Sequence, residues 1–304
     1  MATDDAFLEL EPVVGSLLER HLSTTKEWFP HELVPYSRGR DFVAGEAWSE
    51  SDSLIPLDEA ARSSLFVNLL TEDNLPYYSR DIDGVFGREG SWGEWARRWT
   101  AEEGRHSIVI RDYLTVTRAI DPIELERGRM AQVSKGEVPA PTGRFNSVVY
   151  LTLQELATRI AHRNTGKLLD DPVGYELMAR VAADENFHHL FYRDLTSAAI
   201  ELDPSATMIA IDHEVRTFAM PGTGIPNFDV HAQRIARAGI YDLNVHHEQI
   251  LVPIVMRQWK VPELTGLSAE AERARDRLLA YLERAARVSA RLARRRERVG
   301  VSAG

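Results

Sequence analysis

The sequence predicts an all-α protein whose core is a four-helix bundle with additional helices around it. Apolar residues recur at three- and four-residue steps through eight stretches, and strand-like alternation is hard to find. A Glu-x-x-His motif also occurs twice, each time inside a helical stretch, as it does in bundles that hold metal ions between their helices. The helical stretches are 57–80, 91–119, 145–165, 171–200, 203–219, 228–240, 242–259 and 268–299.

We expect residues 1–304 to form a single domain in three parts. Residues 1–56 should cover the bundle, because 30–55 is irregular and interrupted by proline and glycine. Residues 57–260 should supply the bundle and the helices that follow it, with 120–145 as a crossover between two halves. Residues 268–299 should form a basic C-terminal helix. Breakers between the stretches include Asp121-Pro122, Asp203-Pro204 and Asp171-Pro172, the last at a helix start.

The net charge of −10 is unevenly distributed along the chain. From Ser268 onward there are ten arginines and five acidic residues, which gives +5 and leaves −15 for residues 1–267. Nucleic acids bind to basic faces, so we expect no nucleic-acid partner for the main body.

The composition is that of a globular protein without thiol chemistry. No apolar run approaches the roughly 20 residues of a transmembrane helix. The start, "MATDDAFLEL", lacks the basic-then-apolar layout of a signal peptide. Cysteine is absent, which excludes disulfides and zinc–thiolate sites. Any metal must therefore bind His, Asp and Glu, and we expect a cytoplasmic location.

Two segments of the chain repeat the same motif. "AEEGRHSIVIRD" (101–112) aligns without a gap with "ADENFHHLFYRD" (183–194), 82 residues later. Each copy has a Glu three residues before a His: Glu103 and His106, then Glu185 and His188. Residues three apart share a helix face, so both side chains of each pair point the same way. The repeated spacing indicates that the two helices act as a matched pair.

Each motif is preceded, about one helix earlier, by an acid in an otherwise apolar stretch. Glu72 lies 31 residues before Glu103, and Glu155 lies 30 residues before Glu185. An unpaired carboxylate is costly to bury, and a bound metal offsets that cost. Di-iron bundles use two Glu-x-x-His helices and one Glu from each of two further helices. The predicted ligands are Glu72, Glu103, His106, Glu155, Glu185 and His188.

Four carboxylates balance the charge of two divalent ions. Mixed oxygen and nitrogen ligands suit iron, with manganese as a possible substitute, better than magnesium or calcium. The acid before each ligand glutamate can reach a neighbouring helix. We expect Asp184 to accept a hydrogen bond from His106, and Glu102 to accept one from His188, which would fix the tautomer of each imidazole.

With these motifs the sequence resembles the soluble acyl-acyl carrier protein desaturases in their actinobacterial form. The resemblance covers most of residues 20–260 and rests on "LTEDNLPYY", "WGEWARRWTAEEGRHSIVIRDYL", "QELATRIAHRNTG", "VAADENFHHLFY" and "MPGTGIPNFD". It implies a ferritin-like bundle, usually homodimeric, that acts in fatty acid biosynthesis. Such enzymes use O₂ and two electrons from reduced ferredoxin to insert a cis double bond into an acyl chain carried on acyl carrier protein.

The resemblance also assigns roles to residues. It divides the six ligands between two irons bridged by Glu103 and Glu185: one iron is bound by Glu72, Glu103 and His106, and the other by Glu155, Glu185 and His188.

Three further residues receive roles from the same resemblance. Thr158 matches a threonine beside the oxygen-binding face, and Trp28 resembles the tryptophan of an electron path that continues through Asp184 and His106.

The motifs depart from the family pattern at positions that are not ligands. The usual Glu-Asn-Arg-His is Glu-Gly-Arg-His at 103–106, and the usual Glu-Lys-Arg-His-Glu is Glu-Asn-Phe-His-His at 185–189. We therefore expect the metal site to be kept and the surface that recognises the carrier protein or electron donor to differ.

Simpler interpretations exist for several of these residues. The six candidate ligands could instead be buried carboxylates paired with arginines, namely Arg105, Arg111, Arg159 and Arg193. The duplicated spacing argues against that. We expect a structural hydrogen bond for His162 and a surface position for His189. We expect bundle packing or solvation for His246, His247 and Glu248, and core packing rather than cofactor contact for Trp92, Trp95 and Trp99.

The C-terminal helix has an apolar stripe surrounded by arginine. A docking helix with a solvated face is the simpler interpretation, and capture of an acidic carrier protein or a membrane surface is the alternative.

Three functions compete at this point. The desaturase is the leading hypothesis. The others are a di-iron acyl hydroxylase on the same scaffold and a non-catalytic homologue that binds acyl chains or carrier protein.

Overall fold

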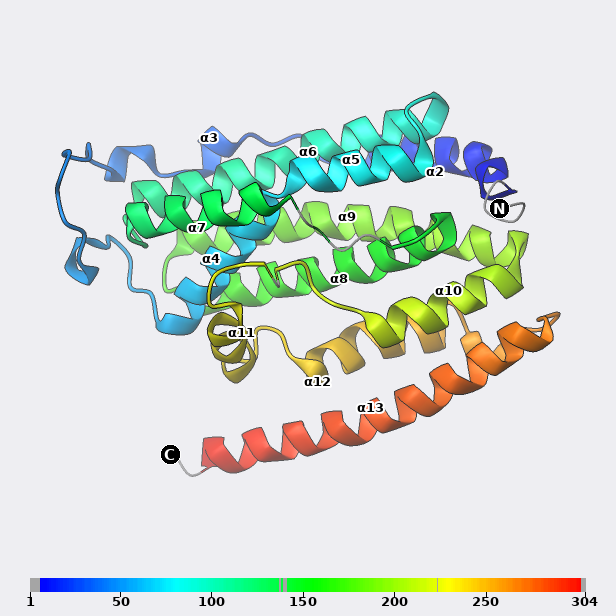
Figure 1. Ribbon diagram of the computed structural model, residues 1–304. Helices are drawn as coiled ribbons and strands as arrows, with labels where there is room; N and C mark the ends of the chain where they lie inside the picture. The colour runs from blue at the N-terminus through cyan, green and yellow to red at the C-terminus, as the bar shows by residue number, and fades with distance from the viewer. Residues whose placement is uncertain (1–5, 137, 139–140, 223, 302–304) are drawn as a thin grey trace.

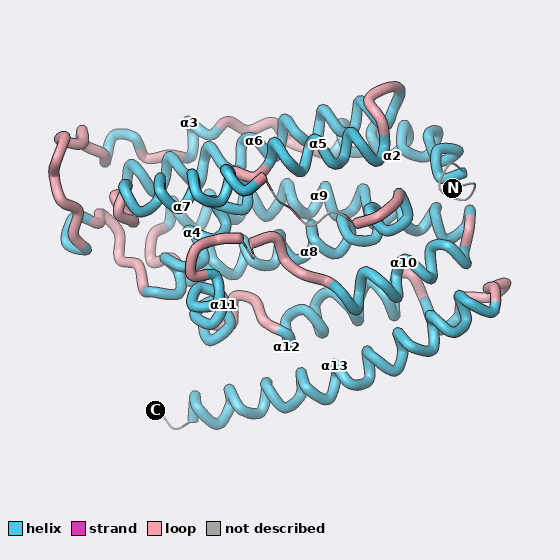
Figure 2. The backbone as a smooth tube through the Cα atoms, in the orientation of Figure 1, coloured by secondary structure: helices cyan, strands magenta, loops and turns pink. Residues whose placement is uncertain are grey.

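The secondary structure of the chain is helical throughout the described residues. The computed structural model describes residues 6–136, 138, 141–222 and 224–301, with only the backbone for 295–301. No β-strand occurs within these residues (Figure 2). The all-α prediction is confirmed. None of the helices in these residues is long and apolar enough to cross a membrane.

Four helices form the core of the bundle and carry all the candidate ligands (Figure 1). They are α4 (Glu59–Glu72), α6 (Gly90–Val116), α8 (Arg144–Leu168) and α9 (Pro172–Leu202). Helices α8 and α9 pack against each other along much of their length, and α6 contacts both α4 and α9. This arrangement is the predicted ferritin-like bundle.

Three helices begin at Asp-Pro steps, as the sequence indicates for one of them. These helices are α7 (Pro122–Lys135), α9 and α10 (Pro204–Thr217). In each, the aspartate accepts a hydrogen bond from a backbone N–H of the first turn, and the proline occupies a position whose N–H would have no partner.

The N-terminal part contains a helix that the sequence analysis did not identify. Helix α2 (Glu11–Thr24) follows a short 3₁₀ turn, η1 (Phe7–Leu10), and contacts α6 and α9. Val14, Leu17 and Leu18 are buried at this contact. The next segment is irregular, as predicted, with only short turns of helix: α3 (Pro30–Leu33), η2 (Tyr36–Arg38) and η3 (Glu50–Asp52).

One predicted helical stretch is divided, and the predicted crossover contains a helix of its own. The stretch 57–80 is not one helix, because α4 ends at Glu72 and α5 (Leu75–Phe86) begins beyond a two-residue break with Pro76 in its first turn. The crossover 120–145 is not only a connection, because it contains α7. The stretch 242–259 is helical as expected but divided into α12 (Leu243–His246) and a π-helix, η4 (His247–Gln258).

The remaining elements cover one side of the bundle. They are α11 (Phe228–Arg237), the 3₁₀ turn η5 (Val261–Glu263) and the C-terminal helix α13 (Ala269–Val301). Helix α13 runs along α10 and α12 (Figure 1) and buries Ala271, Ala274, Leu278 and Leu282. These contacts support the proposal that residues 1–304 form one domain.

Candidate metal centre

The structure brings the six predicted ligands together in the middle of the four-helix core. Helix α4 contributes one carboxylate and α8 another, while α6 and α9 each contribute a Glu-x-x-His pair. All six side chains are buried: Glu72, Glu103, His106, Glu155, Glu185 and His188. A run of helical turns places each motif on the inner face of its helix, as the spacing predicts.

The six side chains form two overlapping groups. In each group the potential ligand atoms all lie within 4.8 Å of one another. Glu103 and Glu185 belong to both groups, as bridging carboxylates would. The first group is completed by Glu72 and His106, and the second by Glu155 and His188.

Several inward-facing atoms of this cluster lack hydrogen-bond partners among the described residues. His106 Nδ1 lies 3.3 Å from Glu103 Oε2, and His188 Nδ1 lies 2.8 Å from Glu103 Oε1, yet neither nitrogen forms a hydrogen bond. Glu103 Oε1 and Glu155 Oε2 also lack one. Buried polar atoms are normally satisfied, so four orphaned atoms shared between the two groups fit a pair of metal ions.

The pKa values of the cluster side chains also indicate a site for cations. Burial, followed by repulsion from Glu185, raises the pKa of Glu155 well above its usual range and that of Glu103 in the same direction. Burial opposes the charged form of both imidazoles, but the surrounding carboxylates outweigh it and raise the pKa of His106 and His188. Without added cations, the cluster therefore retains protons to reduce its negative charge.

The outer nitrogen of each imidazole faces the acid that the sequence predicts. His188 Nε2 lies 2.9 Å from Glu102 Oε2, which is the predicted hydrogen bond. His106 Nε2 lies 3.5 Å from Asp184 Oδ2 but forms no hydrogen bond within the described residues. Burial raises the pKa of Asp184, but its interactions, led by that with the nearby His106 imidazole, lower it to about 2, so this carboxylate is charged. A carboxylate on the outer nitrogen leaves the inner one free to bind a metal.

Trp28 and Thr158 both lie close to the cluster. Trp28 is buried, and its Nε1 donates to Asp184 Oδ2 at 2.7 Å. Thr158 Oγ1 donates to Glu185 Oε2 at 2.9 Å and faces a cavity beside the cluster.

Two residues at the site were missed by the sequence analysis. Trp99 is core-packed as predicted, but its Nε1 also donates to Glu155 Oε1 at 3.0 Å. His21, on α2, lies 2.9 Å from Glu102 Oε2. A histidine in line with the apolar residues Val14 and Leu18 of a helix is the signal that could have identified it.

The simpler interpretations have mixed outcomes. None of the four named arginines forms an ion pair with a candidate ligand in the described residues; Arg105, for example, pairs with Asp184. His162 makes the predicted hydrogen bond, but its partner is the candidate ligand Glu72, at 3.0 Å. His246 and His247 are buried in the bundle, in line with a packing role.

The surface position predicted for His189 is wrong. Its side chain is 4% exposed, and its Nδ1 lies 2.9 Å from the carbonyl oxygen of Thr152 on α8. Burial lowers its pKa to about 4, so this imidazole is neutral. The close packing of α8 against α9 leaves no solvent at this face of the helix.

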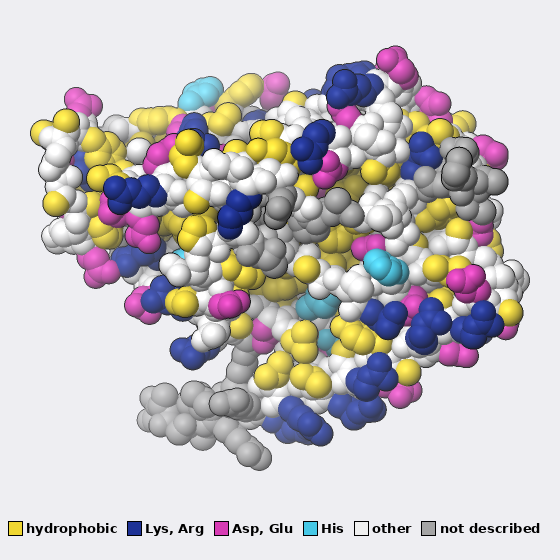
Figure 3. Space-filling model, in the orientation of Figure 1, with side chains coloured by type: hydrophobic (Ala, Val, Ile, Leu, Met, Phe, Trp, Pro, Cys, Tyr) yellow, Lys and Arg dark blue, Asp and Glu magenta, His cyan; other side chains and the backbone are white. Residues whose placement is uncertain are grey.

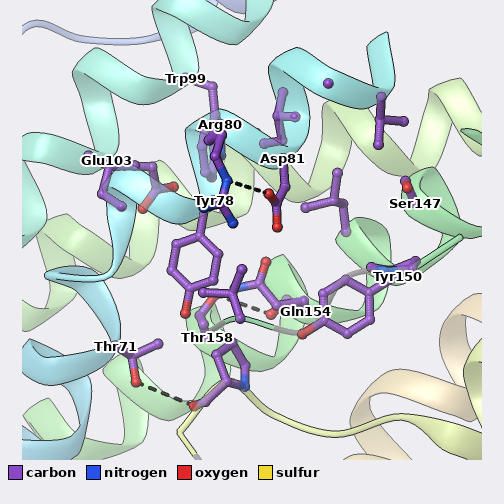
Figure 4. Close-up of a pocket in the computed structure, with 18 of the residues that line it drawn as sticks. Thr71, Tyr78, Arg80, Asp81, Trp99, Glu103, Ser147, Tyr150, Gln154 and Thr158 are labelled. Carbon is purple, nitrogen blue, oxygen red and sulfur yellow. Dashed lines mark hydrogen bonds and ion pairs between the residues drawn. The ribbon is translucent and has the colours of Figure 1, made fainter. Parts of the chain in front are cut away.

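A cavity of 510 Å³ borders the cluster between α4, α5, α6 and α8. Figure 4 shows Tyr78, Tyr150 and Thr158 around it, with Glu103 at its edge. Its walls also include apolar side chains, among them Leu75, Ile82, Val85, Phe86 and Leu151. A volume of this size, largely apolar and in contact with potential metal ligands, is typical of a binding site for an organic substrate.

The chain is similar to known proteins in sequence and in architecture. A family model described as fatty acid desaturase matches residues 3–302. The chain is 44% identical over 280 residues to a protein of Mycobacterium tuberculosis assigned as the acyl-[acyl-carrier-protein] desaturase DesA1, which covers 89% of this chain and 82% of that protein. It is 29% identical over 307 residues to the chloroplastic stearoyl-[acyl-carrier-protein] 9-desaturase of Gossypium hirsutum, which covers 94% of this chain and 76% of that protein.

A solved structure agrees with these matches. The X-ray structure of DesA2, assigned as an acyl-ACP desaturase of Mycobacterium tuberculosis H37Rv, superposes with a TM-score of 0.72 at 27% identity, over 89% of this chain and 99% of the other. Motifs, bundle and similarity along almost the full length lead to one conclusion: the chain belongs to the fatty acid desaturase family.

Proposed function

We propose that the protein is an acyl-[acyl carrier protein] desaturase that inserts a cis double bond into a carrier-bound fatty acyl chain. The observation that carries this proposal is the pair of facing Glu-x-x-His helices, whose glutamates Glu103 and Glu185 line a largely apolar cavity. The names of the relatives from Mycobacterium tuberculosis and Gossypium hirsutum support the same reaction and the same carrier.

The proposal includes two iron ions in the cluster, with manganese as a substitute. The donor set of four carboxylates and two imidazoles suits these metals. Glu72 and His106 would hold one ion, Glu155 and His188 the other, and Glu103 and Glu185 both. Bound, reduced metal ions would allow O₂ to serve as the strong oxidant that is needed to remove hydrogen from an unactivated methylene.

The cavity would bind and orient the acyl chain. Each methylene moved from water into an apolar site contributes about 0.8 kcal/mol, so a long chain is held without polar contacts. A smaller space of 110 Å³ lies next to the cavity, between α4, α8 and α11, and the two share Glu72 and Thr158 in their walls. A chain in this position passes directly beside the cluster.

Side chains around the cluster would orient the carboxylate ligands through hydrogen bonds. Thr158 donates to Glu185 and fixes the orientation of this carboxylate at the wall of the cavity. Trp99 does the same for Glu155 from the opposite helix. The overall change removes two hydrogens from the chain and, with two electrons and two protons, reduces O₂ to two waters.

The electron route is proposed to run through Trp28, Asp184 and His106. The supporting contacts are 2.7 Å from Trp28 to Asp184 and 3.5 Å from Asp184 to His106. Ferredoxin as the electron donor and a homodimer belong to the same proposal and are supported by the family resemblance. A cytoplasmic location is also proposed, on the basis of the cysteine-free composition.

The deciding experiment is to load the purified protein with Fe(II) and supply a ferredoxin reducing system, O₂ and stearoyl-carrier protein. Mass analysis of the acyl chain gives the outcome. Loss of two hydrogens supports the desaturase. Gain of one oxygen would replace it with the hydroxylase. An unchanged chain on iron-loaded protein would favour the non-catalytic, chain-binding homologue.

A further inference from the structure

The side chain of His21 is almost completely enclosed. It lies on α2 and is 3% exposed. The edge of its ring meets Trp95 at 5.1 Å between ring centroids and Phe187 at 6.1 Å. Burying an imidazole normally costs free energy, so its polar atoms should serve a purpose.

The Nε2 atom of His21 lies 2.9 Å from Oε2 of Glu102. The same oxygen lies 2.9 Å from Nε2 of His188, and the other carboxylate oxygen accepts from Arg98 at 2.6 Å. Glu102 is thus held from three sides, by residues of α2, α6 and α9.

This arrangement favours one tautomer of His188. Oε2 of Glu102 lies 2.9 Å from Nε2 of both imidazoles, and a carboxylate oxygen accepts hydrogen bonds, so hydrogen is favoured on the Nε2 atoms of His21 and His188. A neutral His188 then presents the lone pair of its Nδ1 to the cluster, where that atom lies 2.8 Å from Glu103 Oε1. The hydrogen-bond network therefore prepares His188 as a metal ligand.

The two halves of the cluster are supported in parallel ways. On the first half, Trp28 donates to Asp184, which faces His106. On the second half, His21 contacts Glu102, which faces His188. In both cases the outermost member comes from the segment before the bundle.

We propose that His21 is a positioning residue that orients Glu102, and through it His188, for the second metal ion. This inference rests on the proposed metal cluster and adds to it a residue outside the ligand motifs. It predicts that loss of the His21 imidazole weakens the binding of one of the two metal ions and leaves the affinity for the other largely unchanged.

A small cavity allows the role of His21 to be tested chemically. The cavity has a volume of 140 Å³, lies between α2 and α9, and is lined by His21, Arg20, Thr24 and Phe187 among others. Nδ1 of His21 has no hydrogen-bond partner among the described residues. Removing the imidazole would therefore leave a hole beside an existing space, into which a small ring can enter.

The experiment measures metal binding directly. Apo-protein is titrated with Co(II) by calorimetry and by visible absorption, for the wild type, His21→Phe and His21→Gln. Phe keeps a ring but removes the donor, whereas Gln keeps a donor. We expect His21→Phe to weaken one of two binding steps about 10–100-fold, as for other residues that support a metal ligand, and His21→Gln to retain most of the affinity.

His246→Phe is the matched control. His246 is a buried histidine that bonds to Tyr241 and lies outside the cluster, so the same substitution should leave both Co(II) steps unchanged. Circular dichroism on all variants identifies any that do not fold, and a His21→Phe variant that does not fold is replaced by His21→Ala.

Rescue separates hydrogen bonding from packing. Added imidazole should restore the weakened step in His21→Ala, whereas thiophene, which has a similar shape without the donor, should not. Equal affinities in wild type and His21→Phe, or equal rescue by both rings, would overturn the inference. A wild-type protein that binds no metal would instead refute the proposed function.

Discussion

The indole Nε1 of Trp28 donates a hydrogen bond of 2.7 Å to Oδ2 of Asp184. This contact joins residues 156 positions apart and connects the irregular N-terminal segment to a ligand helix. The guanidinium of Arg105 lies 4.8 Å and that of Arg180 5.6 Å from the centroid of the indole ring, which fixes its plane.

Trp28→Phe should separate electron supply from metal binding. Phenylalanine keeps a ring between the two arginines but lacks the N–H donor to Asp184. We expect two metals per chain, as in the wild type, and at least about tenfold slower reduction of the cluster, since a hydrogen bond to a charged group is lost. Stopped-flow mixing with reduced ferredoxin measures the rate. An unchanged rate would exclude Trp28 from the electron route.

Thr158→Val should lower turnover without releasing metal. The hydroxyl donates to Glu185 Oε2, and valine has nearly the same shape without this donor. We expect turnover to fall about tenfold, the effect of losing one hydrogen bond to a charged group, at unchanged metal content.

Thr152→Val is the control for that substitution. Thr152 is buried on the same helix, but its hydroxyl bonds to Val148 and Thr196 rather than to the cluster. Its replacement should have a similar cost in stability and little effect on turnover. Equal turnover in the two variants would show that the Thr158 hydroxyl has no special role.

Metal affinity should increase with pH. The surrounding carboxylates raise the pKa of His106 and His188 above the usual value of 6.5, so each imidazole must lose a proton before its Nδ1 can bind a metal. Calorimetric titration with Mn(II) between about pH 6 and pH 8, in buffers of different ionisation enthalpy, should show tighter binding and fewer released protons as pH rises. A constant affinity would contradict the proposed ligands.

The same shifts have a consequence for the metal-free protein. A raised histidine pKa stabilises the fold at pH values below the unfolded pKa, and this stabilisation is lost as pH rises through the folded pKa. The thermal midpoint of the apo-protein should therefore fall as pH rises through this range, and added metal should reduce the fall. A midpoint that rises with pH for the apo-protein alone would contradict the shifts.

Helix α13 should affect carrier affinity through charge. Its exposed arginines recur at three- and four-residue steps and form no ion pair within the described residues: Arg284, Arg287, Arg291 and Arg294. Basic side chains, all of them arginine in this helix, gather along α13 on the face shown in Figure 3. Deleting 285–304, or combining Arg287→Glu with Arg291→Glu, should weaken binding of the acidic carrier protein about tenfold at low salt and less at high salt.

Arg127→Glu on α7 provides the control for charge, since Arg127 is also exposed. It should leave carrier affinity unchanged. If the α13 variants bind the carrier as the wild type does but lose affinity for anionic vesicles, the helix serves a membrane surface instead. If neither affinity changes, it is a docking helix with a solvated face.

Two errors of the sequence-based predictions at the site share one physical origin. A surface position is predicted for His189 because it faces a different side of the helix from the ligand His188, but the packing of α8 against α9 buries it. Trp99 was assigned to packing alone because nothing in the local sequence shows that its indole reaches Glu155 from another helix. Each error concerns contact between helices, which helical periodicity does not encode.

The ligand set was predictable because its geometry is local. Glu103 and His106 share a helix face by spacing alone, as do Glu185 and His188, and the chain repeats the spacing. Isolated acids in apolar stretches, Glu72 among them, mark buried charges that require compensation.

The sequence by itself determined the helical class and the two matched motifs, because these depend on the 3.6-residue period of one helix. It also indicated Glu72 and Glu155, because an acid in an apolar stretch of a helix marks a buried charge. Only the tertiary structure decided that His21 reaches Glu102 across 81 positions, that His189 is buried, and that a cavity of 510 Å³ opens beside the cluster. These features arise where side chains of different helices fill or leave space, and that depends on how the helices pack.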